Sequence, residues 1–215
     1  MSLLVSVFLK EGIILASDSR TTYKTSTSIK YTDQTYKSVL MDNKIGIAHC
    51  LNATVNGKTI DDHLQDFMKK YKGRGLTRIP KLLKEYFLNL NPKCVIEFIV
   101  CGYIGETPYG YRIETQGNIE RFITSPQHVY WAGDRDVPSR LFSMNYFKSN
   151  NRFIAHNQRK LKLDKFSISE GINFAEFLIY TSKSVMSYQE CDQTIGGPID
   201  ILVLKPNSSY WYRRK

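Results

Sequence analysis

The chain has 215 residues, of which 42% are hydrophobic and 23% charged. This ordinary globular balance predicts a single domain over residues 1–215 that is large enough to bury a core. No apolar run approaches the roughly 20 residues of a membrane-spanning helix, so we expect no membrane partner. No basic segment followed by a long apolar one opens the chain, which argues against a secretory signal. The four cysteines show no CxxC spacing. They predict neither a disulfide framework nor a zinc site and fit a reducing cytoplasm.

The formal net charge is +10, from 30 basic and 20 acidic side chains. Such a charge is compatible with nucleic-acid binding, but the basic residues are scattered and no known nucleic-acid module is present. The densest cluster consists of Arg152, Arg159, Lys160, Lys162 and Lys165. A solvated loop or a subunit contact explains that cluster more simply, so we expect no nucleic-acid partner.

Two hairpins are predicted at the start of the chain. β-Branched and apolar runs separated by short polar turns pair Leu3–Leu9 with Ile13–Asp18, and Lys37–Met41 with Ile45–Cys50. A segment rich in Thr and Ser, Thr21–Thr35, is predicted to be the loop between the hairpins.

Amphipathic helices and further strands follow. Apolar residues at helical spacing predict helices over Ile60–Tyr71 and Ile79–Leu90. Three strands are then expected at Val95–Tyr103, Tyr109–Glu114 and Ile119–Thr124.

The last third repeats this alternation. We expect a short strand at Val129–Ala132, helices at Pro138–Phe147 and Phe174–Tyr188, and closing strands at Pro198–Leu204 and Ser209–Arg213. Strands grouped at both ends and in the middle, with paired helices between them, predict an α+β fold. Its expected architecture is a four-layer αββα sandwich of two antiparallel sheets.

The start of the chain carries a candidate nucleophile. Ser2 follows the initiator Met1, and methionine aminopeptidase normally removes a Met that precedes a small residue. The exposed α-amine, with a pKa of roughly 7.7–8.0, is then a general base for the hydroxyl of its own residue. Asp18 follows sixteen residues later, at the end of the second predicted strand.

These features resemble the N-terminal nucleophile hydrolases of the proteasome β-subunit and HslV family. The opening SLLVSVFLKEGIILASDSR is similar to the start of a proteasome β-type chain, with Ser2 where that family usually has threonine. The closing DQTIGGPIDILVLKP and SSYWYRR resemble the last segment and hairpin of the bacterial proteasome-like groups, which are Anbu and the β-proteobacterial homologue. The middle, from about residue 54 to residue 133, matches only in layout. The resemblance implies the family's fold and peptide hydrolysis.

The resemblance also implies catalytic partners for Ser2. Asp18 falls at the family's spacing from the nucleophile, Arg20 matches its following arginine, and Lys37 begins the third strand as the family's catalytic lysine does. A buried lysine beside an amine and a carboxylate would have its pKa lowered and would help to deprotonate Ser2 or stabilise charge near it. The loop before Lys37 is longer than usual, so Lys30 is the second candidate.

Further supporting residues are implied near the C-terminus and the centre. Asp192 stands where the family has an aspartate that supports the terminal amine. Thr194 takes the place of a supporting serine, unless the alignment puts Ile195 there. Asp134 lies near the position of another such serine.

The oxyanion donor departs from the family pattern. The family has a glycine pair after the fourth strand, whereas this chain reads IAHCLN. A backbone donor needs no particular side chain, so the N–H of Leu51 is the expected donor. Adjacent strand residues point to opposite faces, so His49 and Cys50 are interpreted as packing residues. The other histidines, His63, His128 and His156, lack ligand spacing, and neither a metal nor a cofactor is predicted.

Four functions remain open from the sequence. The leading one is a peptidase subunit of a self-compartmentalised homo-oligomeric ring that acts on peptides or unfolded proteins, with any ATPase unfoldase unknown. The others are an amidohydrolase of the same fold acting on a small amide, a non-catalytic ring-forming subunit, and a basic nucleic-acid-binding module. Aromatic residues on the helix predicted at Pro138–Phe147, namely Phe142, Tyr146 and Phe147, favour either a subunit interface or packing within the monomer.

Overall fold

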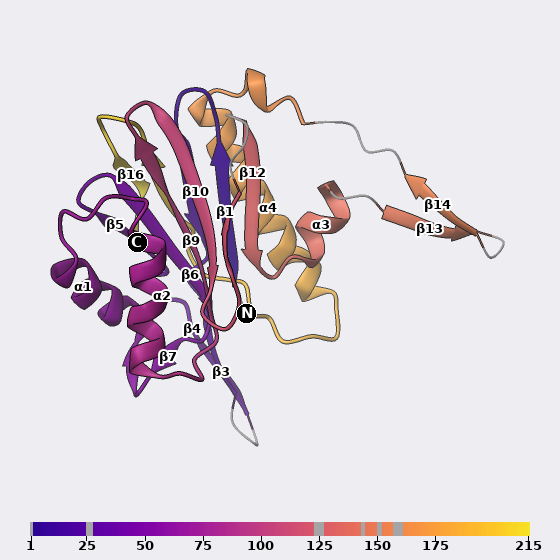
Figure 1. Ribbon diagram of the computed structural model, residues 1–215. Coiled ribbons are helices and arrows are strands. Elements are labelled where there is room, and N and C mark those ends of the chain that lie inside the picture. Colours follow the sequence, from indigo (N-terminus) through magenta and orange to yellow (C-terminus); the bar gives the residue numbers. More distant parts are fainter. Residues whose placement is uncertain (1, 25–27, 123–126, 143–144, 150–151, 157–160) are drawn as a thin grey trace.

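Two five-stranded antiparallel sheets form the centre of the molecule (Figure 1). The computed structural model describes residues 2–24, 28–122, 127–142, 145–149, 152–156 and 161–215. The first sheet has the order β12-β1-β2-β15-β16. Its strands are β12 (His128–Gly133), β1 (Leu3–Phe8), β2 (Ile13–Ser17), β15 (Asp200–Leu204) and β16 (Tyr210–Arg213).

The second sheet has the order β11-β10-β9-β6-β5. Its strands are β11 (Ile119–Arg121), β10 (Thr107–Glu114), β9 (Ile96–Ile104), β6 (Ile45–Leu51) and β5 (Ser38–Met41). Both hairpins predicted at the start of the chain are therefore present, but the first lies in one sheet and the second in the other.

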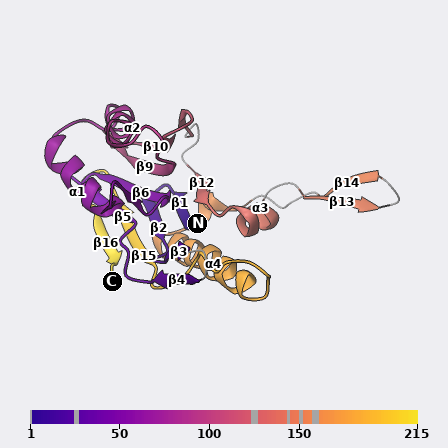
Figure 2. The same ribbon diagram turned by 90° about the horizontal axis from the view of Figure 1, so that it is seen from below.

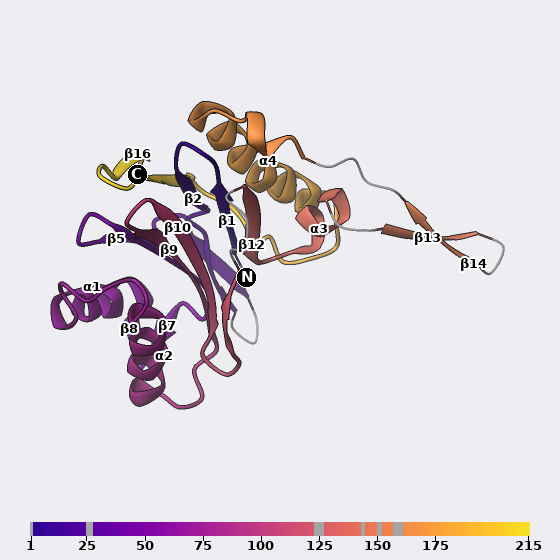
Figure 3. The ribbon, with the colours of Figure 1, turned by 45° about the horizontal axis from the view of Figure 1, so that its top comes forward.

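Helices cover the outer face of each sheet (Figures 2 and 3). α1 (Ile60–Lys70) and α2 (Ile79–Leu90) lie over the second sheet. α4 (Ile168–Ser187) lies over the first sheet, with α3 (Asp136–Phe142) packed beside it. The arrangement is the four-layer αββα sandwich expected from the sequence.

Three apolar clusters separate the four layers. One lies between α1, α2 and the second sheet, and another between α4 and the first sheet. The third fills the space between the two sheets, where Phe8, Leu15, Ile99 and Leu202 are fully buried. Because both faces of the first sheet are covered, β1 and β2 are buried at every position. Such strands read as continuous apolar runs rather than alternating ones.

Three short hairpins and one 3₁₀ turn complete the described structure. The hairpins are β3 (Thr21–Lys24) with β4 (Ile29–Thr32), β7 (Thr54–Val55) with β8 (Lys58–Thr59), and β13 (Asn145–Ser149) with β14 (Arg152–His156); the turn is η1 (Leu163–Lys165). The hairpin of β13 and β14 projects away from the sandwich (Figure 1).

Some predicted elements were wrong. The segment Thr21–Thr35 is not a plain loop, because it contains the β3–β4 hairpin. The helix predicted at Pro138–Phe147 ends at Phe142, and its last predicted residues lie in β13. Aromatic residues suit a strand as well as a helix, so periodicity alone did not locate this boundary.

The last helix begins six residues before the predicted Phe174. Ser167 caps its N-terminus, and the side chain of Glu170 accepts a hydrogen bond from the backbone N–H of Ser167. This capping box is visible in the sequence as Ser-x-x-Glu and would have given the correct start.

The aromatic residues offered as interface candidates fall into two groups. The Phe142 ring packs against that of Phe174 with centroids 5.4 Å apart, so it belongs to the core of the monomer. The side chains of Tyr146 and Phe147 lie outside the described part of the structure, as do those of Arg152, Arg159 and Lys160 in the basic cluster. Among the described helices, none combines the length and apolar character needed to cross a membrane.

Candidate active site

The ends of three strands bring the candidate catalytic residues together. Ser2 immediately precedes β1 and Asp18 immediately follows β2. These strands pair antiparallel, with Leu4 opposite Ser17, so the start of one lies beside the end of the other. Both residues are therefore positioned by the first sheet.

Lys37 comes from the other sheet, directly before β5. A hydrogen bond of 2.7 Å between the hydroxyls of Ser17 and Ser38 joins the two sheets beside it. Residues adjacent to this contact, Asp18 and Lys37, are thereby brought within hydrogen-bond distance. Lys30 lies on the exposed strand β4, opposite Tyr23 in register.

The Lys37 ammonium makes three short contacts. Its Nζ donates to Ser2 Oγ at 2.6 Å, to Asp18 Oδ1 at 2.9 Å and to the Arg20 carbonyl oxygen at 2.5 Å. An ammonium has three N–H donors, and each has one acceptor here. Lys37 is 2% exposed, and its burial lowers the pKa while the adjacent Asp18 carboxylate opposes that shift.

Asp18 is fully buried and accepts four hydrogen bonds. Besides Lys37, its Oδ1 accepts from the N–H of Leu3 at 3.1 Å. Its Oδ2 accepts from the N–H of Arg20 at 3.1 Å and of Gly196 at 3.0 Å. A buried charge is tolerated when it is paired and hydrogen-bonded in this way. Asp18 thus joins the start of β1, the end of β2 and the Gly-Gly segment near the C-terminus.

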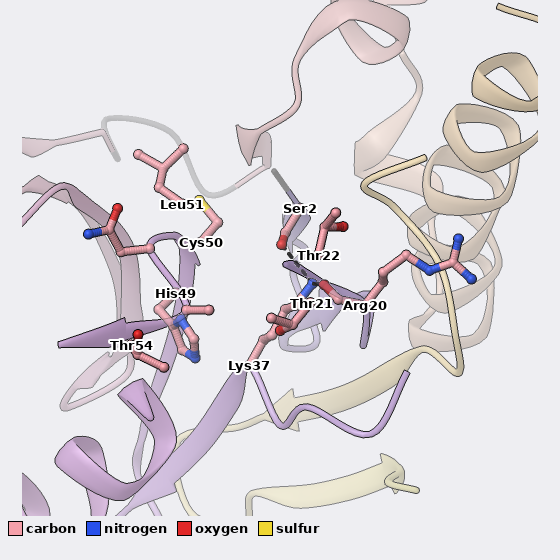
Figure 4. Close-up of a pocket in the computed structure, with 11 residues that line it drawn as sticks. Ser2, Arg20, Thr21, Thr22, Lys37, His49, Cys50, Leu51 and Thr54 are labelled. Carbon is pink, nitrogen blue, oxygen red and sulfur yellow. Dashed lines mark hydrogen bonds between the residues drawn. The ribbon is translucent and has the colours of Figure 1, made fainter. Parts of the chain in front are cut away.

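Arg20 points away from Ser2 (Figure 4). Its guanidinium makes a bidentate ion pair with Asp33, with N···O distances of 2.7 and 2.8 Å, and lies over the Tyr31 ring. It also donates to the Gln193 carbonyl at 3.4 Å. Hydrogen bonding to Arg20 lowers the pKa of Asp33. The side chain of Arg20 therefore anchors a loop, while its carbonyl oxygen faces Lys37.

Of the supporting residues predicted from the sequence, Asp134 contacts Ser2 through its backbone, whereas Asp192 and Thr194 line a separate pocket. The backbone N–H of Asp134 donates to the Ser2 carbonyl oxygen at 2.7 Å, whereas its side chain accepts from the N–H of Asp136. Asp192 and Thr194 line a second pocket of about 400 Å³ together with Asp134. The Thr194 hydroxyl is buried and has no hydrogen-bond partner among the described residues, and Ile195 belongs to the apolar cluster under α4.

A pocket of about 300 Å³ opens beside Ser2. Ser2, Lys37, Thr21 and Thr22 lie on one side of it and His49, Cys50, Leu51 and Thr54 on the other (Figure 4). Two buried polar atoms of this lining, Thr22 Oγ1 and His49 Nδ1, have no hydrogen-bond partner within the described ranges. A pocket with such a lining suits a ligand that carries hydrogen-bonding groups.

His49 and Cys50, interpreted from the sequence as packing residues, are both buried, and both also line this pocket. Burial, together with the positive charge of Lys37, lowers the pKa of His49 to about 3. The imidazole is therefore neutral at physiological pH. Burial beside Glu97 raises the pKa of Cys50, so its thiol stays protonated and is a poor nucleophile.

Leu51 has an unusual backbone at the end of β6. Its φ is +78°, a left-handed conformation that favours glycine. The N–H of Asn52 donates to the carbonyl of Val95, directly before β9, whereas that of His49 donates to the Lys37 carbonyl on the opposite edge. Residues two apart in a strand donate from the same edge, so the Leu51 N–H faces the same side as that of His49, toward the pocket.

Two groups escaped the sequence analysis. Asp33, which fixes Arg20, lies inside the segment interpreted as a loop. Lys215 Nζ donates to Ser19 Oγ at 2.7 Å, to the Thr35 carbonyl at 2.8 Å and to Asp200 at 2.7 Å. It thereby ties together the segments that carry Asp18 and Lys37. No sequence pattern indicated this pairing, because its members are up to 196 residues apart.

Comparison with protein-family models and with curated proteins gives no match. Among solved structures, the chain is similar to Anbu from Hyphomicrobium sp. strain MC1, with a TM-score of 0.67 and 15% identity over 99% of this chain and 86% of that one. It is also similar to the Gly-1 mutant of that Anbu, with a TM-score of 0.68 and 15% identity over 100% and 86% of the two chains. At this identity the likeness establishes the fold. It confirms, at that level, the expected resemblance to bacterial proteasome-like proteins.

Replacing Leu51 by glycine tests the backbone strain at the edge of the pocket. A left-handed non-glycine residue costs about 1–2 kcal/mol, which offsets the loss of a side chain that is 38% exposed. We expect Leu51→Gly to change the free energy of unfolding by less than about 1 kcal/mol. The matched variant Leu40→Gly, in β5 and packed between the sheets, is expected to cost about 2 kcal/mol or more. Denaturant unfolding measures both, and equal losses would contradict the assignment of strain.

Proposed function

We propose that the chain is an amide hydrolase of the N-terminal nucleophile type, cleaving peptide bonds with Ser2 as nucleophile after removal of Met1. The observation that carries the proposal is the buried Lys37 ammonium, 2.6 Å from Ser2 Oγ and 2.9 Å from Asp18, at the edge of a pocket. A hydroxyl held by a lysine and open to a cavity has the environment that an activated nucleophile needs.

The α-amine of Ser2 is the general base in this mechanism. With Met1 removed, the amine and the hydroxyl belong to the same residue, and an amine with a pKa of roughly 7.7–8.0 is substantially neutral near physiological pH. It takes the Oγ proton as Oγ attacks the substrate carbonyl carbon. It then returns the proton to the departing amine, which leaves an ester on Ser2 that water hydrolyses.

Lys37 acts by charge rather than by accepting the proton. All three of its N–H groups are engaged, so the ammonium form fits the site without a missing partner. Its donation to Oγ stabilises the negative charge that develops there when the proton leaves. Asp18 holds Lys37 in place and compensates the cost of burying its charge.

The tetrahedral intermediate needs a donor for its oxyanion. Leu51 lines the pocket at the end of β6, on the side opposite Ser2 (Figure 4), and the strand register puts its N–H on the pocket edge of β6. We assign it this role because a backbone N–H aimed into a cavity is the usual form of such a donor. The side chains of Asp192 and Thr194 are assigned to the surroundings of the terminal amine.

A small-amide hydrolase is the second candidate, and one feature favours it. The pocket beside Ser2 is mainly polar, with Thr21, Thr22, Asn52 and Thr54 in its lining. The unpartnered Thr22 Oγ1 and His49 Nδ1 would hydrogen-bond a small polar substrate. For a peptide substrate, the same lining favours a polar side chain next to the cleaved bond.

Enclosure in a cytoplasmic homo-oligomeric ring completes the proposal. A peptidase with broad specificity is safe among cellular proteins when its sites face a chamber. Support comes from α4, where Phe177 is 47%, Tyr180 50% and the following Tyr188 90% exposed, because aromatic residues are enriched at interfaces. Peptides or unfolded proteins would be the substrates.

Removing the Ser2 hydroxyl should abolish hydrolysis without unfolding the protein. We expect Ser2→Ala to lower kcat/KM for a peptide substrate by more than about a thousandfold. The free energy of unfolding should fall by about 1–3 kcal/mol, because one N–H of the buried Lys37 ammonium loses its acceptor. Ser208→Ala, at an exposed serine, is the matched control and should keep wild-type activity. If Ser2→Ala hydrolysed the peptide at the wild-type rate, the nucleophile would lie elsewhere.

Substitutions of Lys37 and of Lys30 should differ in their effect on hydrolysis. Lys37→Ala should lower kcat/KM by about a hundredfold or more, since it removes a donor to the developing charge, whereas Lys30→Ala should leave it unchanged. Adding Asp18→Asn to Lys37→Ala should cost little more than either change alone, because the two groups act as one unit. Steady-state kinetics of the four variants measure this. A loss in Lys30→Ala with normal rates in Lys37→Ala would reverse the assignment.

Oligomer mass tests the proposed enclosure. Light scattering at micromolar concentration should give a multiple of the 24.9 kDa chain mass that persists across salt concentrations. A mass equal to that of one chain under every condition would refute the ring and favour the small-amide hydrolase.

A further inference from the structure

Glu97 is a buried acidic residue that the chemistry above leaves unused. It lies near the start of β9, in the sheet that does not carry Ser2, and is 3% exposed. Its carboxylate accepts from Arg112 Nε at 2.5 Å and from Arg135. Burying a carboxylate costs free energy unless cations pair with it. The guanidinium groups of Arg112 and Arg135 supply that pairing for Glu97.

A third partner connects Glu97 to the other sheet. The N–H of Gly133, at the end of β12, donates to Glu97 Oε2 at 3.0 Å. Gly133 has a φ of +85°, and a Cβ built on it would lie 2.0 Å from the Ser2 carbonyl oxygen. The turn at Gly133 is therefore packed directly against the backbone of Ser2, with no space for a side chain.

The residue after this glycine completes the contact. The N–H of Asp134 donates to the Ser2 carbonyl oxygen at 2.7 Å, while the N–H of Leu3 donates to Asp18 Oδ1 at 3.1 Å. The peptide unit between Ser2 and Leu3 is thus held at its oxygen by the turn and at its nitrogen by Asp18. Rotation of this unit would move Ser2 Oγ away from Lys37 Nζ.

We propose that Glu97 is a positioning residue for Ser2, acting through the Gly133–Asp134 turn. Arg112 and Arg135 fix the carboxylate, the carboxylate fixes the N–H of Gly133, and the next N–H fixes the Ser2 carbonyl. Glu97 contacts neither Ser2 nor the three atoms around Lys37 Nζ. Its Oε2 also accepts from Cys50 Sγ at 3.7 Å, but its link to Ser2 itself passes through the backbone of the turn. The proposal rests on the proposed role of Ser2 as nucleophile.

Charge distinguishes this role from simple space filling. A glutamine at position 97 has the same shape, but its NH₂ group is a donor. It would face either the Gly133 N–H or a guanidinium, which are donors themselves. Glu97→Gln therefore loosens the turn while leaving the packing between the sheets in place.

The test measures how fast Ser2 is acylated. A β-lactone probe reacts with the Ser2 hydroxyl by ring opening, and intact mass followed over time gives kinact and KI. We expect Glu97→Gln to lower kinact by about tenfold to a hundredfold, the effect of misplacing a reacting group by up to about 1 Å. KI should stay within about a factor of three, because no pocket-lining residue is substituted and Cys50 keeps its contact with the backbone carbonyl of residue 97.

Glu120→Gln is the matched control. Glu120 is an exposed carboxylate, 3.4 Å from the same Arg112, and it has no contact with Gly133 among the described hydrogen bonds. The Glu120→Gln variant should have the same kinact as the wild type. Thermal unfolding of each variant ensures that rates are compared for folded protein.

A second variant decides the case if Glu97→Gln does not fold. Arg135→Gln removes one partner of Glu97 at a position that is 39% exposed, and it should lower kinact by a smaller factor with KI unchanged. Wild-type kinact in a folded Glu97→Gln, or in Arg135→Gln when the first variant is unfolded, overturns the Glu97 proposal alone. Absence of any Ser2 adduct in the wild type overturns the proposed nucleophile instead.

Discussion

The arrangement of the whole site depends on one buried cation. Lys37 is 2% exposed, and removing an ammonium from water costs several kcal/mol unless acceptors replace its hydration. The fold supplies an acceptor for each of its N–H groups, from the hydroxyl of Ser2, the carboxylate of Asp18 and the carbonyl of Arg20. All three come from the first sheet or its loops, whereas Lys37 belongs to the second. The cation is therefore stable only when the two sheets are packed together.

This requirement explains why several polar contacts cross between the sheets at the same end. The hydroxyls of Ser17 and Ser38 join β2 to β5, and Glu97 joins β9 to the turn after β12. Most of the remaining space between the sheets is filled by apolar side chains. The apolar part holds the sheets together, and the polar end fixes how Ser2 faces Lys37. Assembly of the sandwich and formation of the candidate site are thus one event.

The sequence predicted the parts of the structure that have strong local signals. The apolar runs of the β1–β2 hairpin and the helical periodicity of α1 and α2 predicted these elements from the sequence. Polar strands such as β3 and β4, which are short and partly exposed, lack that pattern and were missed. The end of α3 was misplaced because aromatic residues fit both helix and strand.

For the site, the resemblance named Ser2, Asp18 and Lys37, and the structure brings all three into contact. The choice between Lys37 and Lys30 needed the contact of β2 with β5, which no local pattern encodes. Glu97 and Lys215 act through partners up to 38 and 196 residues away, so a single sequence could not reveal them. Asp33 is only 13 residues from its partner Arg20, but it lies in the segment interpreted as a loop.

In the proposed mechanism Ser2, freed of Met1 and held by Lys37, is the reactive nucleophile. The most direct measurement is the intact mass of the purified protein before and after treatment with a hydroxyl-directed β-lactone, followed by peptide mapping of the adduct. We expect a chain that lacks one methionine residue and gains one probe molecule, located on Ser2. A chain that retains Met1, or an adduct on any other residue, would contradict the mechanism.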